Sequence, residues 1–230
     1  LTWGQIRVSV CYSDANVKVV ASHTGITTGE DGASHQATED IAIMRSLPGM
    51  VVLVPCDHEQ TKRATEAASA YQGPVYIRFG REKVASMTTA ETPFEVGKAQ
   101  LFREGSDVTI VACGIMVYES MVAAESLATE GISAQVVNCH TVKPLDKSMI
   151  VEAVAKTGAV VTAEEHQLDG GLGGAVAEAV STEIAVPVEM VGVDNTFGES
   201  GKPAELMKKY GITAENVVAA AKAAIARKKP

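Results

Sequence analysis

Residues 17–50 decide the fold, and they read VKVVASHTGITTGEDGASHQATEDIAIMRSLPGM. Residues 18–21 are β-branched and apolar enough for a buried strand, and the glycines at positions 25, 29 and 32 end it. From His35 onward, apolar side chains recur at helical spacing, at Ala37, Ile41, Met44 and Leu47. The stretch therefore predicts a strand, a polar loop and a helix.

Three titratable side chains lie in the predicted loop and at the start of the predicted helix: His23, Asp31 and His35. In open α/β sheets, ligands bind outside the carboxyl ends of the strands, which is where this loop begins. Ser34 is expected to cap the helix, so that His35 lies in its first turn, where the helix dipole favours a neutral imidazole. The alternative is that these are polar loop and capping groups without chemistry, but their clustering favours a site.

The loop and helix also carry a longer pattern. His23 is followed by Gly-Glu-Asp-Gly at residues 29–32, by His35-Gln36 and by Arg-Ser-Leu-Pro-Gly-Met at residues 45–50. This pattern resembles the pyrimidine-binding (Pyr) domain of transketolases. The deoxyxylulose-phosphate synthases and the β subunits of 2-oxoacid dehydrogenases share that fold, but Gly-Glu-Asp-Gly-x-x-His-Gln resembles the transketolase form most closely.

The resemblance implies an enzyme that transfers a two-carbon ketol group between sugar phosphates, with thiamine diphosphate and Mg²⁺ as cofactors of the complete enzyme. By this resemblance His23 and His35 are catalytic, around the reacting C1 and C2 oxygens of the substrate, and Asp31 binds a substrate hydroxyl. The cofactor carries the carbanion chemistry in such an enzyme, while the protein supplies orientation and proton handling.

The chain after this stretch continues the alternation of strands and helices. Residues 51–54 form a short buried strand closed by Pro55, Asp57 caps a helix, and residues 75–79 form a third strand. The packed face of that helix is expected to be Ala64, Ala67, Ala68 and Tyr71. Strands and helices that alternate with short connections predict a parallel sheet with right-handed crossovers.

Arg81 follows the third strand and is the next candidate site residue. A guanidinium at the carboxyl end of a strand can form a bidentate pair with a phosphate. The resemblance implies that Arg81 binds the terminal phosphate of sugar-phosphate substrates, whereas Arg78 is a weaker candidate. The alternative is that Arg81 caps a helix or pairs with Glu82 or Glu95, which would be a surface contact of little consequence.

The second half of the chain predicts another α/β unit. Residues 87–105 lose periodicity and are expected to form a linker with one short strand at most. Strands are then predicted over residues 107–113, 133–138, 159–163 and 186–193, and helices over 116–130, 146–156, 172–183, 203–210 and 213–226. The predicted division is residues 1–86 for the C-terminal part of a Pyr domain, 87–105 for the linker and 106–230 for a second domain. The fold class is thus α/β, with two doubly wound, mostly parallel sheets.

Two motifs in the second domain could be mistaken for sites. Glu164-Glu165-His166 and the glycine-rich residues 170–174 follow a strand and open a helix, an arrangement whose N–H groups can cradle a phosphate. The run lacks both the Gly-x-Gly-x-x-Gly and the Walker pattern, which favours a loop that serves tight packing. Residues 164–174 and Thr-Val-Lys-Pro-Leu-Asp at 141–146 resemble the transketolase C-terminal domain, which implies subunit contacts and a frame for the other domain.

Composition excludes several classes of protein. The chain has 230 residues, of which 46% are hydrophobic, and a net charge of −8, which argues against nucleic-acid binding. Its four cysteines are scattered without metal-ligand spacing and are expected to be reduced core thiols of a cytoplasmic protein, with no metal site. We expect no membrane span and no signal peptide.

The sequence also lacks parts that a thiamine diphosphate enzyme needs. It has no Gly-Asp-Gly metal motif, and Glu30 does not replace the glutamate that activates the cofactor, because the resemblance places that residue before Leu1. The cofactor-binding residues are therefore unknown and expected to lie mainly outside this chain. We expect a fragment or subunit that needs a diphosphate-binding domain or N-terminal subunit and makes homodimer contacts. The alternative from another class is a non-catalytic fragment that only dimerises.

Overall fold

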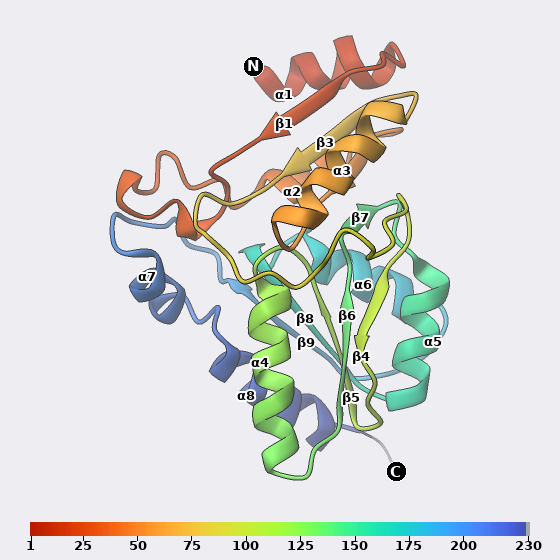
Figure 1. The fold of residues 1–230 in the computed structure, drawn as a ribbon, viewed down its shortest axis with the longest axis vertical. Helices are drawn as coiled ribbons and strands as arrows, with labels where there is room; N and C mark the ends of the chain where they lie inside the picture. Colours follow the sequence, from red (N-terminus) through yellow and green to blue (C-terminus); the bar gives the residue numbers. More distant parts are fainter. Residues whose placement is uncertain (229–230) are drawn as a thin grey trace.

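In the computed structural model, which describes residues 1–228, the chain folds into two α/β sheets with helices around them (Figure 1). Residues 229 and 230, the last two of the predicted second domain, lie outside the described residues. The predicted fold class, two doubly wound and mostly parallel sheets, is confirmed. The exact division into residues 1–86, 87–105 and 106–230 stays a prediction.

The first sheet has the strand order β1-β3-β2-β7. Its parallel strands are β1 (Lys18–Ala21), β3 (Val75–Arg78) and β2 (Val51–Leu53). Its helices are α1 (Thr2–Gln5), which continues as the π-helix η1 (Ile6–Tyr12), then α2 (Asp40–Arg45) and α3 (His58–Ala70). Asp57 caps α3 as expected, because its carboxylate accepts a hydrogen bond from the N–H of Gln60 at 2.8 Å. The buried face of α3 is Gln60, Ala64 and Ala68, while Tyr71 is exposed.

The fourth strand of the first sheet was not predicted. β7 (Thr141–Lys143) pairs antiparallel with β2, although it comes from the second half of the chain. It is too short to show a strand period in the sequence, and its pairing joins residues about 90 positions apart, Val52 and Lys143. The second half of the chain therefore completes the sheet of the first half.

The second sheet has the order β4-β6-β5-β8-β9, with only β4 antiparallel to its neighbour. The strands are β4 (Gln100–Arg103), β5 (Val108–Ala112), β6 (Ala134–Asn138), β8 (Val160–Gln167) and β9 (Val188–Val193). The helices are α4 (Met116–Thr129), α5 (Lys147–Thr157), α6 (Leu172–Ser181), α7 (Pro203–Lys209) and α8 (Ala214–Ala226). Helices α4 and α8 pack together on one face, and α5 and α6 on the other (Figure 1).

The two sheets share a continuous apolar core. One buried cluster contains Ile41 and Val52 from the first sheet and its helix together with Val111, Val137 and Leu172 from the second unit. Residues 87–105 therefore join two units that are packed against each other. Within residues 1–228, no helix has the length and apolar character that a membrane crossing requires.

The helix predicted from His35 begins later than expected. Helix α2 starts at Asp40, and Ser34 does not cap it. The backbone before Asp40 is engaged elsewhere, because the carbonyl of Ala37 accepts from Gly25 N–H at 2.8 Å and that of Thr38 accepts from Gln167 N–H at 2.8 Å. His35 consequently lies in a turn and not at a helix N-terminus.

His140 lies between β6 and β7, where the two units meet. We expect its burial to make the stability of the protein depend on pH. Its ring is fully buried, stacks on Phe94 with 4.2 Å between ring centres, and Nδ1 lies 3.0 Å from Thr141 Oγ1. Burial lowers the pKa of His140 to about 4. In the unfolded chain the pKa of this histidine is about 6.5, so the unfolded state binds a proton at a higher pH than the folded state does. The contribution of neutral His140 to the unfolding free energy is therefore fully present above pH 6.5 and is lost as the pH falls toward 4.

We expect His140 to account for a loss of about 2 kcal/mol in unfolding free energy between pH 7 and pH 5. His140→Phe keeps the stacking on Phe94 and removes the titration, so its pH dependence should be smaller by that amount in denaturant titrations. Parallel pH profiles for the two proteins would contradict the assignment.

Candidate functional site

The candidate site is the loop of residues 22–37 at the carboxyl end of β1. Its middle forms the short 3₁₀-helix η2 (Ile26–Asp31), which is kinked at Gly29, where φ is 76°. Thr24 Oγ1 donates to the carbonyl of Phe79 at 3.2 Å, which ties the loop to the end of β3. The loop thus lies at the sheet edge where ligands of α/β proteins bind, as predicted.

Arg81 and Asp31, predicted separately to bind substrate, lie together in the structure. One terminal nitrogen of Arg81 is 3.2 Å from Asp31 Oδ2 and donates to the carbonyl of Thr28 at 3.1 Å. The side chains of Arg81 and Asp31 are 39% and 46% exposed, so a ligand can reach both. Arg81 therefore pairs with Asp31 and not with Glu82 or Glu95.

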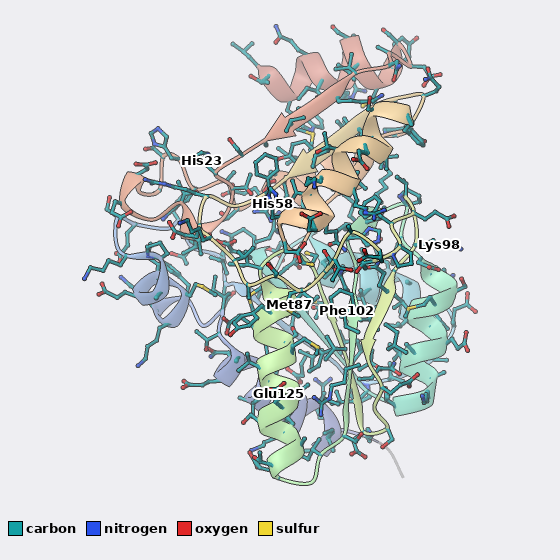
Figure 2. All side chains as sticks on the ribbon, viewed as in Figure 1. His23, His58, Met87, Lys98, Phe102 and Glu125 are labelled. Carbon is teal, nitrogen blue, oxygen red and sulfur yellow. The ribbon has the colours of Figure 1, made fainter. Side chains whose placement is uncertain are left out.

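The two histidines are on the same loop as Asp31, and each ring bonds to a neighbouring serine. Within the described residues, the ring of His23 is hydrogen-bonded to Ser22 Oγ at 3.0 Å, and that of His35 to Ser34 Oγ at 3.1 Å. Both residues are exposed, and Figure 2 shows His23 on the outside of the loop. His23 has a φ of 60°, a left-handed conformation that is uncommon among residues other than glycine. The catalytic roles of His23 and His35 stay predictions.

Arg78, the weaker candidate, is a buried structural residue. Its Nε lies 3.0 Å from Asp40 Oδ2, and its terminal nitrogens donate to the carbonyl of Glu165 at 3.2 and 3.1 Å. Tyr76 also donates to Asp40 Oδ2, at 2.7 Å. Burial opposes the charge of Arg78, but the nearby carboxylates of Asp40 and Glu165 raise its pKa. This buried cluster joins β3, α2 and β8.

The glycine-rich run serves packing, as the sequence favoured. Glu164 lies in β8, and its carboxylate accepts from the N–H groups of Leu172 and Gly173, both at 2.7 Å. A Cβ on Gly171 would lie 2.1 Å from Glu164 Oε2, so only glycine allows this approach. Two N-terminal donors of α6 are thus taken by the chain's own carboxylate and are not open to a phosphate.

Glu165 and His166 are buried in β8, which the sequence did not predict. The sequence predicts both residues in a loop after a strand that ends at residue 163, but β8 continues to Gln167, which still pairs with Val193. Glu165 is buried, and its Oε1 accepts from the N–H of Thr27 in the candidate loop at 2.6 Å. The sequence did not predict this part of the strand, because charged side chains are rarely fully buried.

A groove of about 510 Å³ lies beside Arg81, at the carboxyl ends of β2 and β3. It is lined by Pro55, Cys56, Asp57, His58, Thr61, Phe79, Gly80, Glu82, Lys83, Val84 and Ile115. Asp57 is already bonded to the N–H groups of Met87 and Thr88, both at 2.6 Å, so it is not free for a ligand. The charged side chains of the lining are the carboxylates of Asp57 and Glu82 and the ammonium of Lys83. The exposed guanidinium of Arg81, between Gly80 and Glu82 in the chain, can bind a phosphate bidentately.

The described residues do not form a built site for the cofactor's metal ion. Within residues 1–228, no three His, Cys, Asp or Glu side chains are placed to hold a metal. The cysteines are free, and burial raises the pKa of Cys56 and Cys139 to about 12, so they are poor thiolate ligands.

Two family models match the chain. The model described as "Transketolase, pyrimidine binding domain" matches residues 1–86, and "Transketolase, C-terminal domain" matches residues 97–217. Fold, loop and models together define the class, that of thiamine-diphosphate-dependent enzymes of the transketolase type.

Individual relatives agree with this class. The "6-deoxy-6-sulfo-D-fructose transketolase subunit SqwH" of Clostridium sp. (strain MSTE9) is 46% identical, over 97% of this chain and 70% of its own length. A "Putative transketolase C-terminal section" of Methanocaldococcus jannaschii is 44% identical, over 94% and 68%. A solved structure described as "Split gene transketolase, inactive beta4 tetramer" is 49% identical, with a TM-score of 0.93 over 99% of this chain and 73% of that one. The chain belongs to the transketolase family and is the C-terminal part or subunit of such a transferase.

Replacing the two arginines near the end of β3 should destabilise the protein to different degrees. Arg78→Ala removes one partner of a buried ion pair and should lower the unfolding free energy by about 3 to 5 kcal/mol. Arg81→Ala removes an exposed pair and should cost about 1 kcal/mol or less. Urea denaturation of both variants measures the difference, and equal losses would mean that Arg81 is structural.

Proposed function

We propose that this chain supplies the substrate-facing wall of a transketolase that transfers a two-carbon ketol group between sugar phosphates. The observation that supports this most directly is the exposed Arg81–Asp31 pair, with Asp31 on a loop that matches the transketolase pattern and Arg81 at the end of the neighbouring strand. A guanidinium and a carboxylate side by side can bind the two ends of a polar substrate, a phosphate and a hydroxyl.

In this proposal Arg81 anchors the substrate phosphate and Asp31 accepts a hydrogen bond from a sugar hydroxyl. His23 and His35 hold or move protons at the C1 and C2 oxygens. The electron sink for the two-carbon unit is thiamine diphosphate, with Mg²⁺, and in our proposal its main binding residues lie outside this chain. The chain's own residues orient the substrate and handle its protons.

A partner subunit that carries the diphosphate-binding domain follows from the same proposal. The SqwH relative is named as a subunit, and the solved relative is described as inactive in its beta4 form. Both support a chain that acts only in a larger assembly. We further propose homodimer contacts, a cytoplasmic location and a role in the pentose phosphate pathway. The names of the reported relatives favour a transketolase over a deoxyxylulose-phosphate synthase or a 2-oxoacid dehydrogenase β subunit.

Replacing Arg81 should separate phosphorylated from non-phosphorylated substrates. In the assembled enzyme, Arg81→Ala should raise KM for sugar phosphates roughly 10- to 150-fold. This factor corresponds to the loss of a hydrogen bond to a charged group, about 1.5 to 3 kcal/mol. Non-phosphorylated donors should be nearly unaffected. Steady-state kinetics with both substrate classes measures this, and equal losses would count against phosphate binding by Arg81.

Asp31 should act on a different part of the substrate. Asp31→Ala should reduce kcat/KM according to the stereochemistry of the substrate hydroxyl, because a polar acceptor discriminates hydroxyls better than an apolar wall does. The comparison needs two sugar phosphates that differ at a single hydroxyl. If both epimers lost the same factor, Asp31 would be a loop residue only.

The isolated chain should neither bind thiamine diphosphate tightly nor catalyse transfer. Its described residues offer no metal ligand set, and the Arg81–Asp31 pair is open to water, which weakens its electrostatic effect. Calorimetry with cofactor and Mg²⁺, beside an activity assay with and without a diphosphate-binding partner subunit, tests this. Micromolar cofactor binding or transfer by the chain alone would show that it contains a cofactor site of its own.

A further inference from the structure

The candidate loop is held in part by residues of the second unit. Its η2 helix lies against the segment around α7, where Ser200 Oγ donates to the carbonyl of Glu30 at 2.8 Å (Figure 1). Gln36, which is buried, donates to the carbonyls of Ile26 at 3.1 Å and of Glu199 at 3.0 Å. The shape of the loop therefore depends on a distant part of the sequence.

Glu165 makes a further, buried contact with the loop. Its Oε1 accepts from Thr27 N–H at 2.6 Å, and its Cδ would lie only 2.3 Å from a Cβ on Gly25, whose φ is +83°. Glycine at position 25 thus lets the loop backbone close directly over the carboxylate. A buried carboxylate without a donor is costly, so this geometry fixes Thr27 strongly.

The residue next to Thr27 supports Arg81. The carbonyl of Thr28 accepts from Arg81 at 3.1 Å, and Asp31 on the same loop lies 3.2 Å from the same guanidinium nitrogen. A displacement of Thr27 therefore moves both groups that hold Arg81. The backbone of Glu165 is itself held, because its carbonyl accepts from the buried guanidinium of Arg78.

We infer that Glu165 is a positioning residue that fixes the phosphate-binding geometry of Arg81 through Thr27 and the carbonyl of Thr28. The inference rests on the proposed function for its kinetic consequence, but the loop contact itself does not. Glu165 does not touch the substrate in this account. It gives the second unit, expected to act mainly in subunit contacts, a direct influence on substrate affinity.

Glu164 provides a matched control. It is the neighbouring buried carboxylate of β8, but it accepts from Leu172 and Gly173 of α6 and makes no hydrogen bond to the loop. Glu165→Gln is the conservative variant, because an amide oxygen can still accept from Thr27 N–H. Glu165→Asp, which withdraws the carboxylate by one methylene group, replaces Glu165→Ala if the alanine variant does not fold.

The first measurement is hydrogen exchange of the 230-residue chain and needs no activity. Glu165→Ala should speed exchange at least 10-fold in peptides that contain Thr27, while Glu165→Gln stays within threefold of the parent protein. Glu164→Ala should instead speed exchange at Leu172 and Gly173. Unchanged protection of Thr27 in Glu165→Ala would overturn the inference, whether or not the chain is part of a transketolase.

The second measurement is kinetics of the complex with its partner subunit, thiamine diphosphate and Mg²⁺. Glu165→Ala should raise KM for a sugar phosphate at least fivefold, with a smaller change for a non-phosphorylated donor, and Glu165→Gln should restore most of the affinity. An equal rise in KM for both substrates, as expected for Glu164→Ala, would show that Glu165 has a structural role only. A parent complex without any ketol transfer would refute the proposed function, and the exchange result would then decide the role of Glu165 in the loop.

Discussion

The arrangement of the site depends on the contacts of one buried group, the guanidinium of Arg78. It lies 3.0 Å from Asp40 at the start of α2 and donates to the backbone of Glu165 in β8, so one side chain joins three segments that are far apart in the sequence. A buried charge of this kind is tolerated only where every partner is in place. The candidate loop is bounded by these segments, and it can keep one shape because they cannot shift independently.

The two α/β units are closely interdependent. β7 from the second half completes the first sheet, and apolar residues of both units form one core. The side chain of Glu165 crosses from the second sheet to the loop of the first. Such contacts explain how the second unit can determine the geometry of the loop that carries the proposed substrate-binding residues.

Much of the fold could be predicted because it rests on local signals. The alternation of short apolar strands and helices defined the α/β class, and the Asp57 cap marked the start of α3. The candidates Arg81 and Asp31 were found by position and by motif, but their pairing was not, since they are 50 residues apart. The late start of α2 was missed because the backbone of Ala37 and Thr38 bonds to Gly25 and Gln167, partners that helical periodicity does not reveal.

The sequence by itself determined the alternation of strands and helices, the family pattern of the loop and the candidate residues Asp31 and Arg81. Those properties depend on neighbours along the chain, within one turn of helix or one strand. Only the tertiary structure decided which arginine is buried, which carboxylate caps α6 and which one holds the loop. Glu164 and Glu165 are adjacent and chemically identical, but successive side chains of a strand point to opposite faces, so one meets the N-terminus of α6 and the other meets Thr27.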